Sequence, residues 1–184
     1  MLRFLIRKGI NDITKYLSHT AQQERGSLTI MDIVGSSMKA KCPALWNGRT
    51  KHRSLDLCLI AGGTAVAPCL SLLGALPPSV RSVHLIVSMK HERELQLISD
   101  RLLAASRLSG VRVSVYLTQE EEVGKTGASE GEGFTISYRR ISSSFLASEA
   151  SSIKHYFVYG SASFVMFALT ALQTRQVPRE NVYY

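Results

Sequence analysis

Cysteine and histidine are scarce in this sequence and occur in no metal-binding pattern. The three cysteines, Cys42, Cys58 and Cys69, are widely spaced and form no Cys-x-x-Cys pair, which excludes a zinc ribbon and a redox dithiol. The five histidines show no metal-ligand spacing either. We therefore expect no metal site, and the odd number of cysteines favours a reducing compartment.

Long apolar runs and hydrolase patterns are also missing. No run approaches the ~20 apolar residues that span a bilayer. The best one, residues 157–172, is interrupted by Gly160, Ser161 and Ser163, and we interpret it as a buried strand followed by a helix. No Ser/His/Asp set or Cys/His pair has a recognisable spacing, so hydrolytic chemistry has no support. We expect no transmembrane segment.

Acidic residues are few, since 14 Asp and Glu stand against 22 Lys and Arg and the net charge is +8. This charge suits an acidic partner, a nucleic acid or an anionic cofactor without selecting one. Part of it lies in an acid-free segment around Trp46, here called the basic loop: Lys39, Lys41, Arg49, Lys51 and Arg53. Either the basic loop contacts a larger protein or RNA–protein assembly, or it is a solvated connector.

The N-terminal residues 1–8 are basic and apolar. They are compatible with a mitochondrial presequence, which is Arg-rich and poor in acids, and equally with a strand because polar and apolar residues alternate. The corresponding locations are the mitochondrion and, otherwise, the cytoplasm. As structure, we predict a strand over 2–7, a short helix within 9–18 and a half-buried strand over 28–34.

Strands and helices alternate from residue 55 to the end of the sequence. The predicted strands are 55–61, 83–87, 111–117, 155–159 and 181–184. The predicted helices are 64–73, 91–107, one ending near 147, and 162–174, and 119–133 is predicted to be a mobile loop. This alternation predicts an α/β fold, a parallel Rossmann-like sheet with helices on both faces.

Ligands of such sheets bind at the carboxyl ends of the strands. That rule places Gly62–Thr64, Ser88–Lys90 and Tyr159–Ser163 at one rim. Glycines between a buried strand and a helix let a diphosphate approach the backbone, where amide groups and the helix dipole stabilise its charge. The same junction is also typical of a tight turn that only packs helix against strand.

The segment LIAGGTAVAP, residues 59–68, resembles the A-G-G-T-G-x-x-P segment of the ferredoxin–NADP reductase superfamily. Residues 85–95, 157–164 and 177–184 are similar to that family's second strand, its C-G-P-x-x-M segment and its closing V-P-x-E-x-I strand. The nearest resemblance is to small NAD-binding-domain oxidoreductases related to cytochrome reductases. The resemblance implies bound NAD(P) and hydride transfer between nicotinamide and flavin.

The resemblance extends to the N-terminus, where residues 1–38 are similar to the end of the family's antiparallel flavin-binding β-barrel. It implies a barrel remnant at 1–38, a basic connector at 39–54 and an NAD(P)-binding domain at 55–184. Gly9, Thr14 and Gly35 would then face FAD. The early barrel strands and the family's R-x-Y-S segment have no counterpart, so we do not expect this chain alone to hold FAD tightly.

Three departures concern the chemistry: Tyr159 replaces the family's cysteine, Ser161 its proline and Ala65 its third glycine. No catalytic residue is therefore assigned. The resemblance implies the following cofactor-binding residues: Gly62, Gly63, Thr64, Ala65, Pro68, Ser88, Lys90, Gly160, Ser161, Gly9, Thr14 and Gly35.

Two functions remain open. The first is an NAD(P)H-dependent, flavin-linked oxidoreductase of the ferredoxin reductase type. The second is a catalytically degenerate module that serves as a structural subunit of a ribonucleoprotein or respiratory complex. Glu120, Glu121 and Glu122 after the third strand would repel a 2′-phosphate, which favours NAD over NADP, whereas Lys90 and Arg93 argue the other way.

Overall fold

The computed structural model describes residues 55–119, 129–131, 133–149 and 154–184. All of them belong to the second of the two units into which the chain divides, Met38–Tyr184. The predicted barrel remnant, the basic loop, Gly9, Thr14, Gly35 and Glu120–Glu122 lie outside the described residues.

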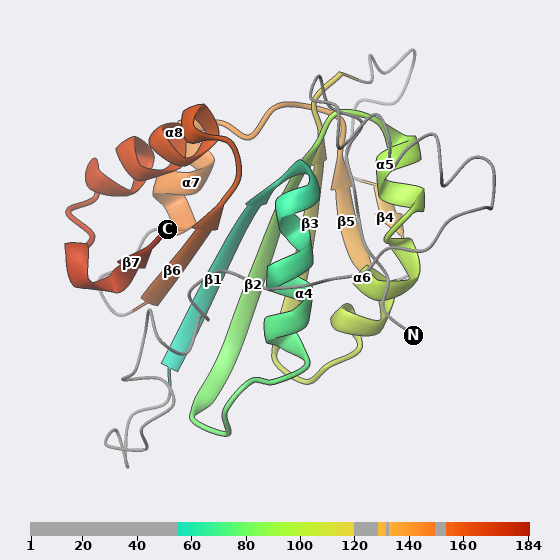
Figure 1. Ribbon diagram of the computed structural model, residues 1–184, viewed down its shortest axis with the longest axis horizontal. Helices are drawn as coiled ribbons and strands as arrows, with labels where there is room; N and C mark the ends of the chain where they lie inside the picture. The colour runs from blue at the N-terminus through green and yellow to red at the C-terminus, as the bar shows by residue number, and fades with distance from the viewer. Residues whose placement is uncertain (1–54, 120–128, 132, 150–153) are drawn as a thin grey trace, which may run out of the picture. The chain divides into compact units, whose positions relative to one another are not determined.

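Seven strands form one sheet in the order β4-β5-β3-β2-β1-β6-β7 (Figure 1). Six of them run parallel, and β4 alone pairs antiparallel, with β5. The strands are β1 Leu55–Gly62, β2 Val80–Met89, β3 Val111–Leu117, β4 Ser129–Gly131, β5 Phe134–Ser137, β6 Lys154–Tyr159 and β7 Val182–Tyr183.

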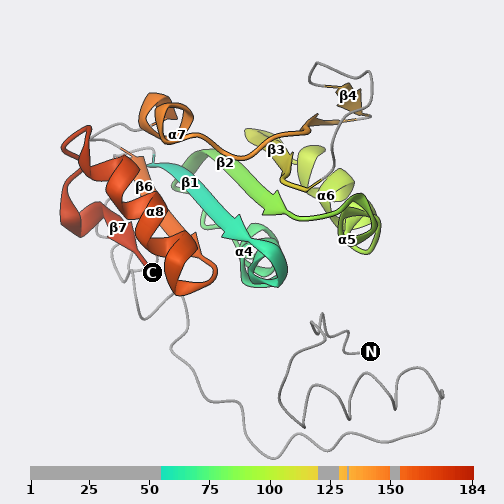
Figure 2. The same cartoon turned by 90° about the horizontal axis from the view of Figure 1, so that it is seen from above.

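Helices cover both faces of this sheet, and Figure 2 shows α4 on one side of the strands and α7 on the other. Even-numbered side chains of β1 and β6, such as Ile60 and Val158, pack with α7 and α8. Odd-numbered ones such as Leu59 face α4 and α6. The described elements between the strands are the 3-10 turn η1 Gly63–Ala65, α4 Val66–Leu73, α5 Glu92–Gln96, α6 Ser99–Ser106, α7 Ser143–Glu149, α8 Ala162–Gln173 and the 3-10 turn η2 Arg179–Asn181. The predicted α/β class is confirmed.

The single helix predicted over 91–107 is wrong, because the chain leaves helical geometry at Ile98 (φ −127°, ψ 2°) between α5 and α6. The Ser99 hydroxyl donates to the Gln96 carbonyl oxygen at 3.1 Å. Serine side chains compete for backbone groups in this way and so weaken a continuous helix. The break leaves Leu97 72% exposed and buries Ile98.

The mobile loop predicted over 119–133 is also wrong in part. Ser129–Gly131 forms β4, and Gly131 is paired with Phe134. Gly133 makes this tight reversal possible, because its φ of 103° is strained for any side chain and a Cβ there would lie 2.5 Å from the Ser106 hydroxyl.

Candidate functional site

The carboxyl ends of β1, β2 and β6 lie side by side at one rim of the sheet (Figure 1). Gly62 is in register with Ser88, and Ala61 is in register with Tyr159. The structure therefore brings together the three segments that the topology predicted. Strand order reverses between β1 and β6, which is the position where open α/β sheets bind ligands.

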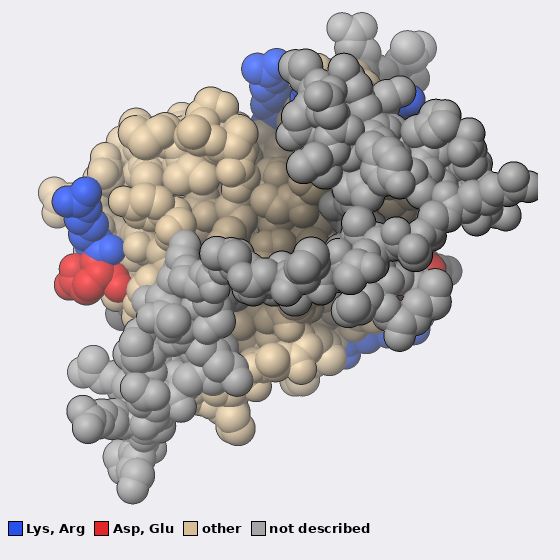
Figure 3. Space-filling view, in the orientation of Figure 1, with Lys and Arg blue, Asp and Glu red and all other residues tan. Residues whose placement is uncertain are grey.

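Gly63 forms a cradle at this rim. Its φ is 60°, and a Cβ built on it meets no atom within 4 Å. Thr64 beside it is exposed, and α4 begins two residues later. In Figure 3, the visible surface where β1 ends and α4 begins carries no Lys, Arg, Asp or Glu. A diphosphate fits this arrangement, since the space is open and the amide groups at the start of a helix attract anions.

Ala65 and Pro68 are compatible with that cradle. Ala65 has ordinary helical dihedral angles (φ −68°, ψ −1°), so the methyl group in place of the family's third glycine adds no backbone strain. Pro68 lies in the first turn of α4, where the missing N–H group costs little.

The β2 side of the rim is polar and fixed by backbone hydrogen bonds. The Thr118 amide donates to the Met89 carbonyl oxygen at 2.8 Å, and the Gln119 amide donates to that of Lys90 at 3.0 Å. The Lys90 amide in turn donates to the Glu94 carboxylate at 3.0 Å. Ser88 is half-buried and the Lys90 side chain is exposed.

The β6 side of the rim differs from the polar β2 side, because the aromatic ring of Phe164 covers it. Phe164, which the sequence analysis did not single out, lies so close that a Cβ on Gly62 would be 3.0 Å from its Cδ1 atom and a Cβ on Gly160 would be 2.6 Å from it. Ser161 caps α8, because its hydroxyl accepts from the Phe164 amide at 3.3 Å. Its signal in the sequence is that Phe164 stands at the position of the methionine in the family's C-G-P-x-x-M segment.

Tyr159 is half-buried at the end of β6. Burial, with a smaller effect of the Cys69 thiol, raises the pKa of Tyr159 to about 12. The phenol therefore stays protonated at neutral pH, where a general base needs a pKa near 7.

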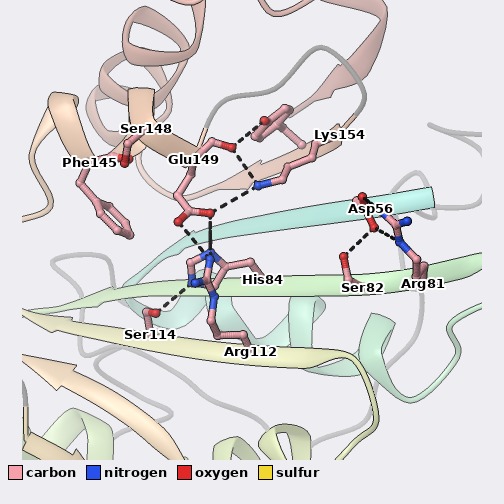
Figure 4. Close-up of polar contacts among 11 residues, drawn as sticks. Asp56, Arg81, Ser82, His84, Arg112, Ser114, Phe145, Ser148, Glu149 and Lys154 are labelled. Atoms are coloured by element: carbon pink, nitrogen blue, oxygen red, sulfur yellow. Dashed lines mark hydrogen bonds and ion pairs between the residues drawn. The ribbon is translucent and has the colours of Figure 1, made fainter. Parts of the chain in front are cut away.

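A second polar cluster lies nearer the amino ends of the strands, and sequence spacing could not reveal it. Glu149 at the end of α7 contacts His84 Nδ1 at 2.9 Å, and His84 Nε2 lies 2.9 Å from the Ser114 hydroxyl (Figure 4). Arg112 and Lys154 donate to the same carboxylate at 3.0 and 3.5 Å.

The geometry assigns the His84 proton to Nδ1, because the Glu149 carboxylate only accepts hydrogen bonds. Arg112 Nη2, 2.8 Å from the same nitrogen, then bonds to Glu149 instead. Burial lowers the pKa of His84 below its ordinary value. Ser114 lies in mid-strand between β2 and β5, where backbone amides pair with neighbouring strands and form no oxyanion hole. This cluster therefore ties α7 to the sheet.

Two further properties concern the described part of the chain. None of its helices is both long enough and apolar enough to cross a membrane. No group of three or more His, Cys, Asp or Glu side chains within it is arranged to hold a metal ion.

Several solved structures share the fold of this chain. The chain is 18% identical to a ferredoxin NADP+ reductase from Neisseria gonorrhoeae with bound FAD and NADP, with a TM-score of 0.55, 82% of this chain and 60% of that one covered. It is 21% identical to a flavohemoglobin from Malassezia yamatoensis (TM-score 0.53, 71% and 31% covered). It is 19% identical to the CS-b5R domains of human Ncb5or in the NAD+ form (TM-score 0.52, 89% and 44% covered).

The chain thus spans less than two thirds of the length of these structures. No curated protein sequence matches it. The family model of the ferric reductase NAD binding domain matches residues 55–161, which is more than half of the chain. This range includes Gly62–Thr64, Ser88–Lys90 and the first three residues of Tyr159–Ser163, and it confirms the predicted superfamily. The chain belongs to the ferric reductase NAD binding domain family.

Proposed function

We propose that this chain holds the nicotinamide dinucleotide of an NAD(P)H-dependent flavin oxidoreductase. The observation that carries the proposal is the open cradle at Gly63, which stands at the strand-order switch and within the residues that the family model matches. When bound, the nucleotide supplies a hydride to a flavin.

Four residues at the rim have a role in this proposal. Gly63 and the first amides of α4 hold the diphosphate, and the Thr64 hydroxyl donates to it. Ser88 and Lys90 meet the adenosine ribose. We infer NAD as the preferred nucleotide from the sequence, in which Thr118 and Gln119 and then Glu120–Glu122 follow the third strand, since these carboxylates would repel a 2′-phosphate.

Calorimetric titration of the purified chain with NADH, NADPH and FAD, alongside its visible spectrum, tests the proposal. We expect micromolar binding of NADH. We expect at least tenfold weaker binding to Gly63→Ala, because its methyl group enters the cradle and favours a different φ. Gly74→Ala is the matched control, since Gly74 has φ −73° and lies away from the rim. A chain that binds neither nicotinamide nucleotide contradicts the proposal.

The aromatic β6 side favours a second candidate, a module that keeps the reductase fold as a structural subunit of a larger assembly. The basic loop would then contact RNA or protein, and the basic N-terminal segment leads us to propose a mitochondrial location. Co-purification of the tagged chain from mitochondria with a large complex, with no flavin absorbance, is the expected result. A flavin-bound chain outside mitochondria contradicts this candidate.

A further inference from the structure

A dinucleotide that crosses the switch point has two halves with different neighbours. At this rim, its adenosine half would lie over the ends of β2 and β3, and its second nucleoside would lie over the end of β6. The residues at these two ends differ in chemistry, so they predict which half is recognised.

The end of β6 is flanked by aromatic side chains on both faces of the sheet. Phe164 packs with the α7 and α8 cluster, on the face of the even-numbered β6 residues. Tyr159 is odd-numbered and lies on the α4 face, where the Cys69 thiol contributes to its raised pKa. The end of β6 thus has an aromatic residue on each face of the sheet.

Phe164 also fills the crevice between β1 and β6. Its ring atoms lie within 3.3 Å of the Cβ positions of both Gly62 and Gly160. These two glycines belong to neighbouring strand ends. A side chain on either would collide with the ring, so the ring fills the space that the two glycines leave on that face.

The two serine hydroxyls at this end are already used within the protein. The Ser161 hydroxyl accepts from the Phe164 amide and lies 3.1 Å from the Ser163 hydroxyl. α8 itself carries no charged residue from Ala162 to Gln173. A nicotinamide needs polar partners for its carboxamide, because a pocket that leaves polar groups unpaired loses affinity.

The adenosine end offers the opposite surface. Lys90 and Gln119 are exposed, and Ser88 and Thr118 are half-exposed. Hydroxyl, amide and ammonium groups there suit the hydroxyls of a ribose. The Gly63 cradle adjoins this end, because Gly62 and Ser88 are register partners.

We propose that this site recognises the adenosine diphosphate half of its ligand and forms no pocket for the nicotinamide half. ADP-ribose and NAD+ therefore bind the same site with similar affinity. This inference rests on the proposed nucleotide binding. For hydride transfer, Tyr159 must move or another protein surface must hold the nicotinamide.

Calorimetric competition on the full chain tests it with NAD+, ADP-ribose and nicotinamide mononucleotide. We expect the Kd values of NAD+ and ADP-ribose to agree within threefold. We expect millimolar mononucleotide to leave the binding of ADP-ribose unchanged. Binding of NAD+ at least tenfold tighter than that of ADP-ribose overturns this inference and leaves the proposed nucleotide binding intact. Binding of neither ligand overturns both.

Tyr159→Cys restores the smaller family residue and gives an independent readout. We expect it to tighten NAD+ binding at least fivefold and to leave ADP-ribose unchanged, since only the nicotinamide half gains space. Equal changes for both ligands contradict a steric role of Tyr159. If the variant fails to fold, the comparison of ligands on the unaltered chain still decides the question.

Discussion

At the scale of single residues, the contact of Phe164 with two glycines yields a direct test of packing. In Gly160→Ala, the new Cβ atom would lie 2.6 Å from Cδ1 of the Phe164 ring and 3.3 Å from the Cβ atom of Phe164. The ring cannot swing clear without disturbing α8, so we expect a loss of about 1–3 kcal/mol in the free energy of unfolding, measured by urea denaturation.

Two variants complete this test. Gly74→Ala adds the same methyl group where the nearest atom is 3.6 Å away, and we expect a change below about 0.5 kcal/mol. Adding Phe164→Ala to Gly160→Ala removes the collision, so the two effects should be less than additive. Additive losses would show that the glycine and the ring do not compete for space.

The second residue-scale prediction concerns pH. Burial lowers the pKa of His84 from its ordinary 6.5, and His84, Arg112 and Lys154 together lower the pKa of Glu149 from 4.5 despite its burial. Both groups bind protons more weakly in the folded than in the unfolded chain. Acid therefore favours unfolding. We expect constant stability from pH 8 to 7 and a decline below pH 6.5 that steepens below pH 4.5.

Urea denaturation at pH 8, 7, 6, 5 and 4 measures this decline. His84→Gln removes the titrating group and should flatten the step between pH 6.5 and 5, while lowering stability at pH 8. His155 also has a pKa lowered by burial, so part of the step should persist. If the His84→Gln variant lost as much stability between pH 6.5 and 5 as the unaltered chain, groups other than His84 would cause the decline.

At the scale of elements, the break between α5 and α6 separates two neighbouring apolar residues. Ile98 is 5% exposed and Leu97 is 72% exposed. We expect Ile98→Ala to cost about 2–5 kcal/mol through the cavity it leaves, and Leu97→Ala to change stability by less than about 0.5 kcal/mol. Thermal and urea unfolding measure both. Equal costs would contradict the burial of Ile98 beside an exposed Leu97.

Elements with a strong pattern were predictable from the sequence. The apolar run over 55–61 identified the central strand β1, because parallel strands are buried on both faces. The glycines at 62 and 63 located the rim. Elsewhere a local interaction ended an element that the apolar pattern predicted to continue. The helical spacing of apolar residues continues past Ser99, but the helix breaks there, where the Ser99 hydroxyl bonds to the Gln96 carbonyl oxygen.

Long-range contacts left no sequence signal. Glu149, His84 and Ser114 come from three elements, and their meeting depends on how α7 lies on the sheet. Phe164 likewise became part of the site only through packing against two strand ends. The short strand β4 has few residues to show alternation, and it depends on the turn at Gly133.

At the scale of the whole molecule, two buried thiols report on global unfolding. Burial raises the pKa values of Cys58 and Cys69 to about 12, so only about one ten-thousandth of each is thiolate at pH 8. In a Cys42→Ser variant, we expect that a disulfide reagent in buffer does not label Cys58 or Cys69 within minutes. In denaturant, we expect it to label both.

The labelling rate should then fall with added NAD+, because a ligand that binds only the folded chain lowers the population of open states. Mass spectrometry of labelled peptides assigns each site. Fast labelling of Cys69 with Cys58 protected would indicate that α4 opens separately from the sheet.

The place of β1 in the sheet has a consequence for synthesis. One edge of β1 can pair soon after translation, because β2 is the next strand in the sequence. The other edge pairs with β6, where Tyr156 is the register partner of Cys58, and β6 is synthesised much later. At about 5–20 residues per second, the ribosome needs on the order of ten seconds to deliver that partner. During this interval the most apolar strand of the described chain presents an unpaired edge, so nascent chains should depend on chaperones until β6 emerges.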